Sequence, residues 1–217
     1  MSRTKDIREA VEDELKFDPL IDSANITVKN VNGVVALNGT VPSYPQYLQA
    51  AAAAQRVHRV KHVHNHLAVE LPDGDHRSDA QVTTAANNAL AGAVTVPDGI
   101  EATARNGNVT LTGTARYGAQ RAAAAVAVAS LAGVRNIKNE IDIDYAADPV
   151  DVSAAVQAAL ARNALVLDDS DVVVDANGNV VSLTGHVRTW AEHQAVIDAA
   201  WRASGVHDVI DNLVVID

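Results

Sequence analysis

Three histidines alternate along one short stretch of the chain: His62, His64 and His66. In an extended strand, residues two apart point to the same face and lie about 6–7 Å apart. Imidazole nitrogens at this spacing can bind zinc or copper, with a third ligand from a neighbouring strand. The row is therefore a candidate metal site, and the alternative is a row of solvated or packed side chains.

A second candidate for cation binding is the acidic run Asp168-Asp169-Ser170-Asp171. Carboxylates can bind Ca²⁺ or K⁺, but the run lacks EF-hand spacing, and a solvated loop is the alternative. The sequence contains no nucleophile elbow, no phosphate-binding loop, no HExxH motif and no cysteine. We therefore expect a protein that is not an enzyme and that holds no cofactor.

Charge is unevenly distributed along the 217 residues, whose formal net charge is −10. Residues 1–72 contain eight Lys or Arg and eight Asp or Glu, whereas residues 147–217 contain three and eleven. An acidic chain without a basic stripe argues against nucleic acid as a partner. It also argues against simple electrostatic docking on anionic lipid. This difference in charge could favour association of the neutral first part, residues 1–72, with the acidic last part, residues 147–217. The alternative is that the acidic charge only keeps the protein soluble.

The first residues, Met-Ser-Arg-Thr-Lys-Asp, lack the apolar segment of a secretory signal. No apolar run reaches the roughly 18 residues that a membrane span needs. We therefore expect a cytoplasmic protein, or a periplasmic one if the N-terminus has been trimmed.

The elements that position these residues recur three times. The phrase Val-x-Leu-x-Gly occurs three times. A second phrase, which reads Gly-Val-x-x-Val/Ile-x-Asn in the middle copy, ends 26 residues after each of these glycines. The paired ends are Gly39 and Asn65, Gly113 and Asn139, and Gly185 and Asp211. This constancy predicts three copies of one small domain of about 70 residues. The predicted domains are 1–72, 79–146 and 148–217.

Each copy begins with an amphipathic helix, since apolar residues fall at i, i+4 and i+8, as in Ile7, Val11 and Leu15. A hairpin follows, with Asn-Gly at 32–33, 106–107 and 177–178 as its turn. The third copy has one more residue between its turn glycine and its phrase glycine, so we expect a bulge or a longer turn there. The phrase glycine ends the second strand and predicts a positive φ or a close approach by another element.

An Ala-rich helix and a last strand complete each copy. We expect these helices at about 44–57, 119–131 and 191–204, because Ala favours helix. Gly133 and Gly205 would end the helix as a C′ glycine does, whereas Arg59 stands at that place in the first copy. The last strand returns after a helical crossover, parallel to a neighbour. The fold class is α+β: three tandem αββαβ two-layer sandwiches, each with two helices on one face of a three-stranded mixed sheet.

The other face of each sheet is then open. Alternation places the three histidines on this open face of the first copy. In the third copy the same face carries Ile210, Val214 and Ile216. Exposed apolar groups are unfavourable, so we expect this face to pack on another copy of the domain or on a second chain.

This pattern resembles the BON domain, a bacterial module of osmotically induced and envelope-linked proteins. The resemblance rests on the Val-x-Leu-x-Gly phrase and on the Gly-Val-x-x-Val/Ile-x-Asn phrase from Gly133 to Asn139. Arg59 replaces the glycine of the second phrase in the first copy, and Asp211 replaces its asparagine in the third. The resemblance covers nearly the whole chain and implies the αββαβ fold.

For function, the resemblance implies a binding or scaffold protein of the bacterial stress or envelope type. Its partners would be phospholipid, another protein or a second copy of the chain. The alternative that it leaves open is a cytoplasmic ion sensor for K⁺ or Ca²⁺, since one cytoplasmic relative binds potassium.

Overall fold

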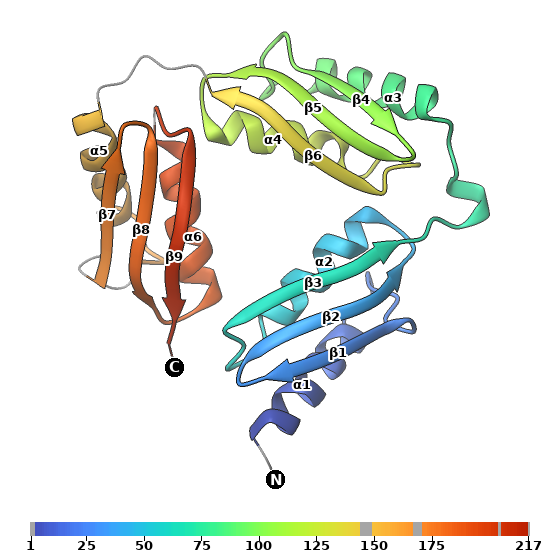
Figure 1. Cartoon of the computed structure of the whole chain (residues 1–217), viewed down its shortest axis with the longest axis horizontal. Coiled ribbons are helices and arrows are strands. Elements are labelled where there is room, and N and C mark those ends of the chain that lie inside the picture. Colours follow the sequence, from blue (N-terminus) through green and yellow to red (C-terminus); the bar gives the residue numbers. More distant parts are fainter. Residues whose placement is uncertain (1–2, 144–148, 167–170, 204, 217) are drawn as a thin grey trace. The chain divides into compact units, whose positions relative to one another are not determined.

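The computed structural model describes residues 3–143, 149–166, 171–203 and 205–216. Within these ranges the order helix, strand, strand, helix, strand occurs three times, and each occurrence forms its own three-stranded sheet (Figure 1). We name these parts module 1, module 2 and module 3 in chain order. The predicted fold class is confirmed.

Module 1 consists of α1 (Arg3–Phe17), β1 (Ile26–Val31), β2 (Val34–Val41), α2 (Tyr44–Gln55) and β3 (His62–Val69). The central strand β2 pairs antiparallel with β1 and parallel with β3. Helices α1 and α2 contact each other and cover one face of this sheet, which leaves the other face open (Figure 1).

Modules 2 and 3 repeat this plan. Module 2 follows the short 3-10 helix η1 (Asp73–Asp75) and contains α3 (Asp79–Gly92), β4 (Glu101–Arg105), β5 (Asn108–Ala115), α4 (Gly118–Ala129) and β6 (Asn136–Ile143). Module 3 contains α5 (Pro149–Ala161), β7 (Val172–Asn177), β8 (Val180–Val187), α6 (Trp190–Arg202) and β9 (Asp208–Val215). In both modules the second strand is the central one.

The core of each module lies between its sheet and its two helices and is built from small and medium-sized apolar residues. The leucine of the phrase Val-x-Leu-x-Gly has no exposed surface in any module: Leu37, Leu111 and Leu183. The apolar stripe of the first helix is buried as well, and its middle residues are Val11, Ala86 and Val156. Because strands alternate faces, the residues on either side of this leucine point away from the core.

The hairpin turns explain why the third copy differs in length. Asn32-Gly33 and Asn106-Gly107 have positive φ at both residues, as a type I′ turn requires. In module 3, Asn177 pairs directly with Val180, so the turn is Gly178-Asn179. There only Gly178 has a positive φ, at +62°, as the first position of a type II′ turn requires. The predicted bulge or longer turn is wrong, since the extra residue only moves the glycine forward within a two-residue turn.

The phrase glycine lies within the second strand and not at its end, because β2 continues to Val41. The φ of Gly39 is +123°, and that of Gly113 and of Gly185 is +128°. A Cβ on Gly39 would overlap the carbonyl oxygen of Asn25 in the neighbouring backbone, and the other two glycines face a backbone carbonyl in the same way. The predicted positive φ and close approach are both confirmed.

The glycine after the second helix has a different role from the one predicted. Helix α4 ends at Ala129, and Gly133 stands four residues later, in a turn in which Val134 N–H donates to the Leu131 carbonyl at 3.2 Å. The φ of Gly133 is +91°, and Gly205 has +83° three residues beyond the end of α6. The predicted C′ position is therefore wrong, although the positive φ is real. Arg59 adopts +68° at the same place in module 1.

Candidate functional site

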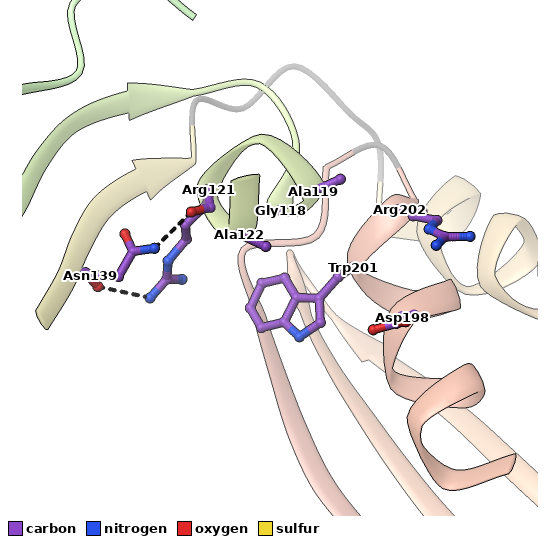
Figure 2. Close-up of a pocket in the computed structure, with 8 residues that line it drawn as sticks. All are labelled: Gly118, Ala119, Arg121, Ala122, Asn139, Asp198, Trp201 and Arg202. Carbon is purple, nitrogen blue, oxygen red and sulfur yellow. Dashed lines mark hydrogen bonds between the residues drawn. The ribbon is translucent and has the colours of Figure 1, made fainter. Parts of the chain in front are cut away.

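The asparagine that ends the second phrase ties the last strand to the crossover helix. In module 1, Asn65 Nδ2 donates to the Tyr47 carbonyl at 2.8 Å, and Asn65 Oδ1 accepts from Leu67 N–H at 3.2 Å. In module 2, Asn139 Nδ2 donates to the Arg121 carbonyl at 2.7 Å. The Arg121 guanidinium returns a hydrogen bond to the Asn139 carbonyl at 3.2 Å (Figure 2). Both asparagines therefore have a structural role: their hydrogen bonds connect the last strand to the crossover helix.

Module 3 fastens the same joint with a different pair. Asp211 Oδ1 accepts from Leu213 N–H at 3.1 Å, as its asparagine counterparts do. A carboxylate has no N–H to donate to the helix carbonyl. Its Oδ2 instead lies 3.0 Å from Nε2 of His193, a buried side chain on α6 that stands 18 residues upstream, as Tyr47 does of Asn65. Sequence reasoning missed His193, although the change from Asn to Asp in the phrase was a signal for a compensating partner.

Two carboxylates with a lowered pKa also have structural roles. Hydrogen bonds from the Gln49 side chain, at 2.8 Å, and from Leu20 N–H, at 3.0 Å, lower the pKa of Asp18. The backbone N–H groups of the turn Asn106-Gly107, at 2.9 and 3.1 Å, lower the pKa of Asp79. In each case the carboxylate holds a loop or turn against a helix of its own module.

The surfaces on which the modules differ are their open sheet faces. We define the open face of a module as the outward-pointing, alternate residues of its three strands. For module 1 these are Thr27, Lys29, Val31, Val34, Ala36, Asn38, Thr40, His62, His64, His66 and Ala68. They include one lysine and three histidines but no Asp or Glu.

The three histidines lie on the open face of module 1, as predicted, and all are exposed. In β2 they stand beside Val34, Ala36 and Asn38, none of which is a usual ligand of zinc or copper. The rings of His64 and His66 are 6.1 Å apart between centroids and nearly parallel, at 15°. Among the described residues, no three His, Cys, Asp or Glu side chains are grouped so that they could hold a metal ion. Metal binding by this row stays a prediction.

The open face of module 2 is polar throughout. Its outward residues are Glu101, Thr103, Arg105, Asn108, Thr110, Thr112, Thr114, Asn136, Lys138, Glu140 and Asp142. A sheet with one face packed on helices normally presents such a polar face to water.

The open face of module 3 departs from this rule. Val173 is 59% exposed, Ile210 47%, Val214 44% and Ile216, just beyond β9, 42%. Two acidic residues, Asp175 on β7 and Asp208 on β9, lie on the same face, and its outward strand positions include no Lys or Arg. The residues of the predicted partner face are exposed, and packing of this face on another module or on a second chain stays a prediction. Sequence reasoning missed Val173, whose alternation with Val172 and Val174 was the available signal.

Equivalent positions show how the three faces have diverged. Counted from the phrase glycine, His64 of module 1 corresponds to Lys138 of module 2 and to Ile210 of module 3. Lys29 of module 1 corresponds in the same way to Asp175 of module 3. The buried positions keep their apolar character, so one scaffold presents three chemically different surfaces.

Only the last residue of the acidic run of the third module lies among the described residues. Asp168, Asp169 and Ser170 lie outside the described residues, and only Asp171 is described, as an exposed residue. Among the described helices, none combines the length and the apolar character that crossing a bilayer requires.

Comparison with solved structures finds a likeness to a secretion protein. The C-terminal domain of CdsD, described as the structural protein of the Type III secretion system of Chlamydia trachomatis, is 17% identical over 98% of each chain, with a TM-score of 0.28. A second structure of CdsD is 17% identical over 97% of this chain and 92% of that one, also with a TM-score of 0.28. Superposition at this score is poor, and no functional statement follows from it. No curated protein matches the chain.

Comparison with protein families gives a match along almost the entire chain. The model described as "BON domain" matches residues 3–70, 78–145 and 148–217. Each match spans one of the αββαβ modules, with its phrase glycine inside the central strand. The chain therefore belongs to the BON family, as three BON domains in tandem.

Proposed function

We propose that this chain is a non-enzymatic binding or scaffold protein of the bacterial stress or envelope type, which holds its partners on the open faces of its BON modules. BON domains bind phospholipids or proteins, and this supports a binding role. The observation that carries the proposal is the exposed apolar face of module 3. Modules 1 and 2 show that the same fold is compatible with a more polar surface at these positions.

The apolar side chains of module 3 are costly to leave in water. Burying a Val or Ile side chain fully contributes about 1.5–3 kcal/mol, and four such side chains are partly exposed on or beside this face. A partner that covers Val173, Ile210 and Val214 would recover part of this free energy. This face is therefore the main docking surface in the proposal.

Charge limits the class of partner. The face of module 3 includes Asp175 and Asp208 and, besides His186 on its central strand, no basic residue, and residues 147–217 contain eleven Asp or Glu against three Lys or Arg. An anionic membrane would be repelled by such a surface. We therefore favour a protein surface that bears cations, or a zwitterionic lipid, over anionic lipid.

Hydroxyl-radical footprinting of the full chain tests the proposal. The chain is labelled at low concentration, at high concentration, with neutral phosphatidylcholine vesicles and with vesicles that also contain phosphatidylglycerol. We expect Ile210 and Val214 to be protected at high concentration or by the phosphatidylcholine vesicles, and to be protected less by the vesicles that contain phosphatidylglycerol. Val126, which is 74% exposed on helix α4, is the internal control and should be labelled alike throughout. Equal labelling of Ile210 and Val214 in all four conditions would contradict the proposal.

A further inference from the structure

We propose that the open face of module 3 binds the open face of module 1 of a second copy, so that chains associate head to tail. This inference rests on the proposed function, because it names the partner of the same docking surface. The inference is supported by two properties of the faces, both of which occur on one chain: the charges at their edges and the side chains at their centres.

The edges of the two faces have opposite charge character. In module 3 both edge strands present an aspartate, Asp175 on β7 and Asp208 on β9. In module 1 neither edge strand presents an acidic residue: β1 presents Lys29, and β3 presents the imidazole of His62 with its two neighbouring histidines. In either orientation, an edge with an aspartate therefore faces an edge with a lysine or with histidines. Such electrostatic complementarity contributes to the choice of partner.

The centres of the two faces are compatible with close approach. The outward residues of the two central strands include no Asp, Glu, Lys or Arg: Val34, Ala36, Asn38 and Thr40 in module 1, and Val180, Ser182, Thr184 and His186 in module 3. Two sheets that pack face to face lie about 10 Å apart, with their side chains interdigitated. Ile210 of one chain and Val31 of the other, which is 67% exposed, would then lose contact with water.

Pairing of like faces is disfavoured. Two module 3 faces would bring the aspartates of both copies together in either orientation, and two module 1 faces would place Lys29 opposite another Lys29 or opposite the histidines, without an acidic residue. Like charges held close together without partners oppose association. The expected contact is therefore heterologous, and such contacts form rings or open chains instead of stopping at a two-fold dimer.

Two double variants test this contact with residues that sister modules already have at the same positions. In the first, Lys29→Asp and His62→Asp give module 1 the aspartates of module 3. In the second, Ile210→Lys takes the residue of module 2 and Val214→Ala that of module 1. All four substituted residues are exposed. Circular dichroism verifies that each variant is folded. Lys138→Ala on the open face of module 2 is the matched control.

Sedimentation velocity measures the outcome, with 22.7 kDa as the monomer mass. We expect the unmodified chain and the Lys138→Ala control to form species that grow with protein concentration and shrink with added salt. Each double variant should associate about 10- to 100-fold more weakly, as expected when one or two apolar side chains or charge pairs are lost. A mixture of the two variants should form a 1:1 complex that does not grow, because one intact face remains on each partner.

Three results would overturn the contact: a monomeric unmodified chain at every concentration, a mixture that stays monomeric, or association that only one double variant weakens. A chain that is monomeric but protected at Ile210 by vesicles would remove the second copy as partner and leave the proposed function in place. A chain that is monomeric and unprotected in every condition would remove both.

Discussion

Nε2 of His193 lies 3.0 Å from Oδ2 of Asp211, and this pair occupies the joint that modules 1 and 2 fasten with an asparagine amide. His193 is largely buried on α6, and its ring lies against that of Trp190, with 4.7 Å between centroids. Module 3 has thus replaced a side chain-to-backbone hydrogen bond by a side chain-to-side chain contact. The two residues should be energetically coupled, because each completes the polar contacts of the other.

His193→Ala should lower the free energy of unfolding of module 3 by about 1–3 kcal/mol, since it leaves the Asp211 carboxylate without its imidazole. In an Asp211→Asn background the same change should cost less, because the asparagine can donate to the carbonyl of residue 193, as Asn65 does to Tyr47. Both tryptophans of the chain, Trp190 and Trp201, lie on α6, so fluorescence during urea unfolding reports on module 3. Additive effects of the two changes would show that the residues are not coupled.

Gly113→Ala should destabilise module 2 by about 2 kcal/mol or more. Its φ of +128° disfavours any side chain, and a Cβ would collide with the Gly99 carbonyl across the hairpin. Gly92→Ala is the control, because Gly92 is the last residue of α3 and a Cβ there meets no atom within 4 Å. The measurement is amide hydrogen exchange of β5 peptides in the full chain, and equal protection in the two variants would contradict the argument.

The repeat explains why the fold could be predicted so fully. Three copies supply three readings of each position, so the helix stripe of Val11 and the hairpin turn at Asn32-Gly33 were each confirmed by their counterparts. The errors concern features that depend on backbone detail. Asn177 looked like a turn residue beside Gly178, but strand pairing keeps it in β7 and moves the turn forward by one residue.

The candidate site was predictable only in part, because alternation shows which residues point outward but not what neighbouring strands place beside them. It identified Ile210, Val214 and Ile216 as outward apolar residues. The edge aspartates Asp175 and Asp208 stood out only once the strand order was known. The partnership of His193 with Asp211 bridges a helix and a strand, and the change from Asn to Asp in the phrase indicated that a partner was needed but not which residue it was.

The lowered pKa of Asp79 predicts an acid-sensitive hairpin in module 2. A carboxylate whose folded pKa lies below its unfolded value of about 4 stabilises the fold at higher pH, and this contribution is lost as the pH falls through the folded pKa. Amide exchange of Asn106 and Gly107 should therefore be slow at pH 6 and accelerate, relative to other amides of the module, in acid. Asp79→Asn should speed exchange at pH 6 but matter less in acid, and Glu101→Gln should have no such effect. A difference between the unmodified chain and Asp79→Asn that does not depend on pH would contradict this assignment.

The fastening pair of module 3 should be transferable to module 2. Asn139→Asp alone should weaken the joint between α4 and β6, because the carboxylate cannot donate to the Arg121 carbonyl that now accepts at 2.7 Å. Arg121 stands 18 residues before Asn139, as His193 does before Asp211, so Arg121→His places an imidazole where module 3 has one. Adding Arg121→His to Asn139→Asp should restore about 1 kcal/mol of the lost stability.

Hydrogen exchange of α4 and β6 peptides measures this recovery, with Arg121→His alone as the control. The single Arg121→His variant should be slightly less protected than the unmodified chain, because it loses the hydrogen bond from the guanidinium to the Asn139 carbonyl. Protection in the double variant should exceed that in Asn139→Asp, because the imidazole gives the carboxylate a partner that the backbone cannot provide. A double variant no better protected than Asn139→Asp would show that the His–Asp contact depends on other features of module 3, such as the packing of Trp190 on His193.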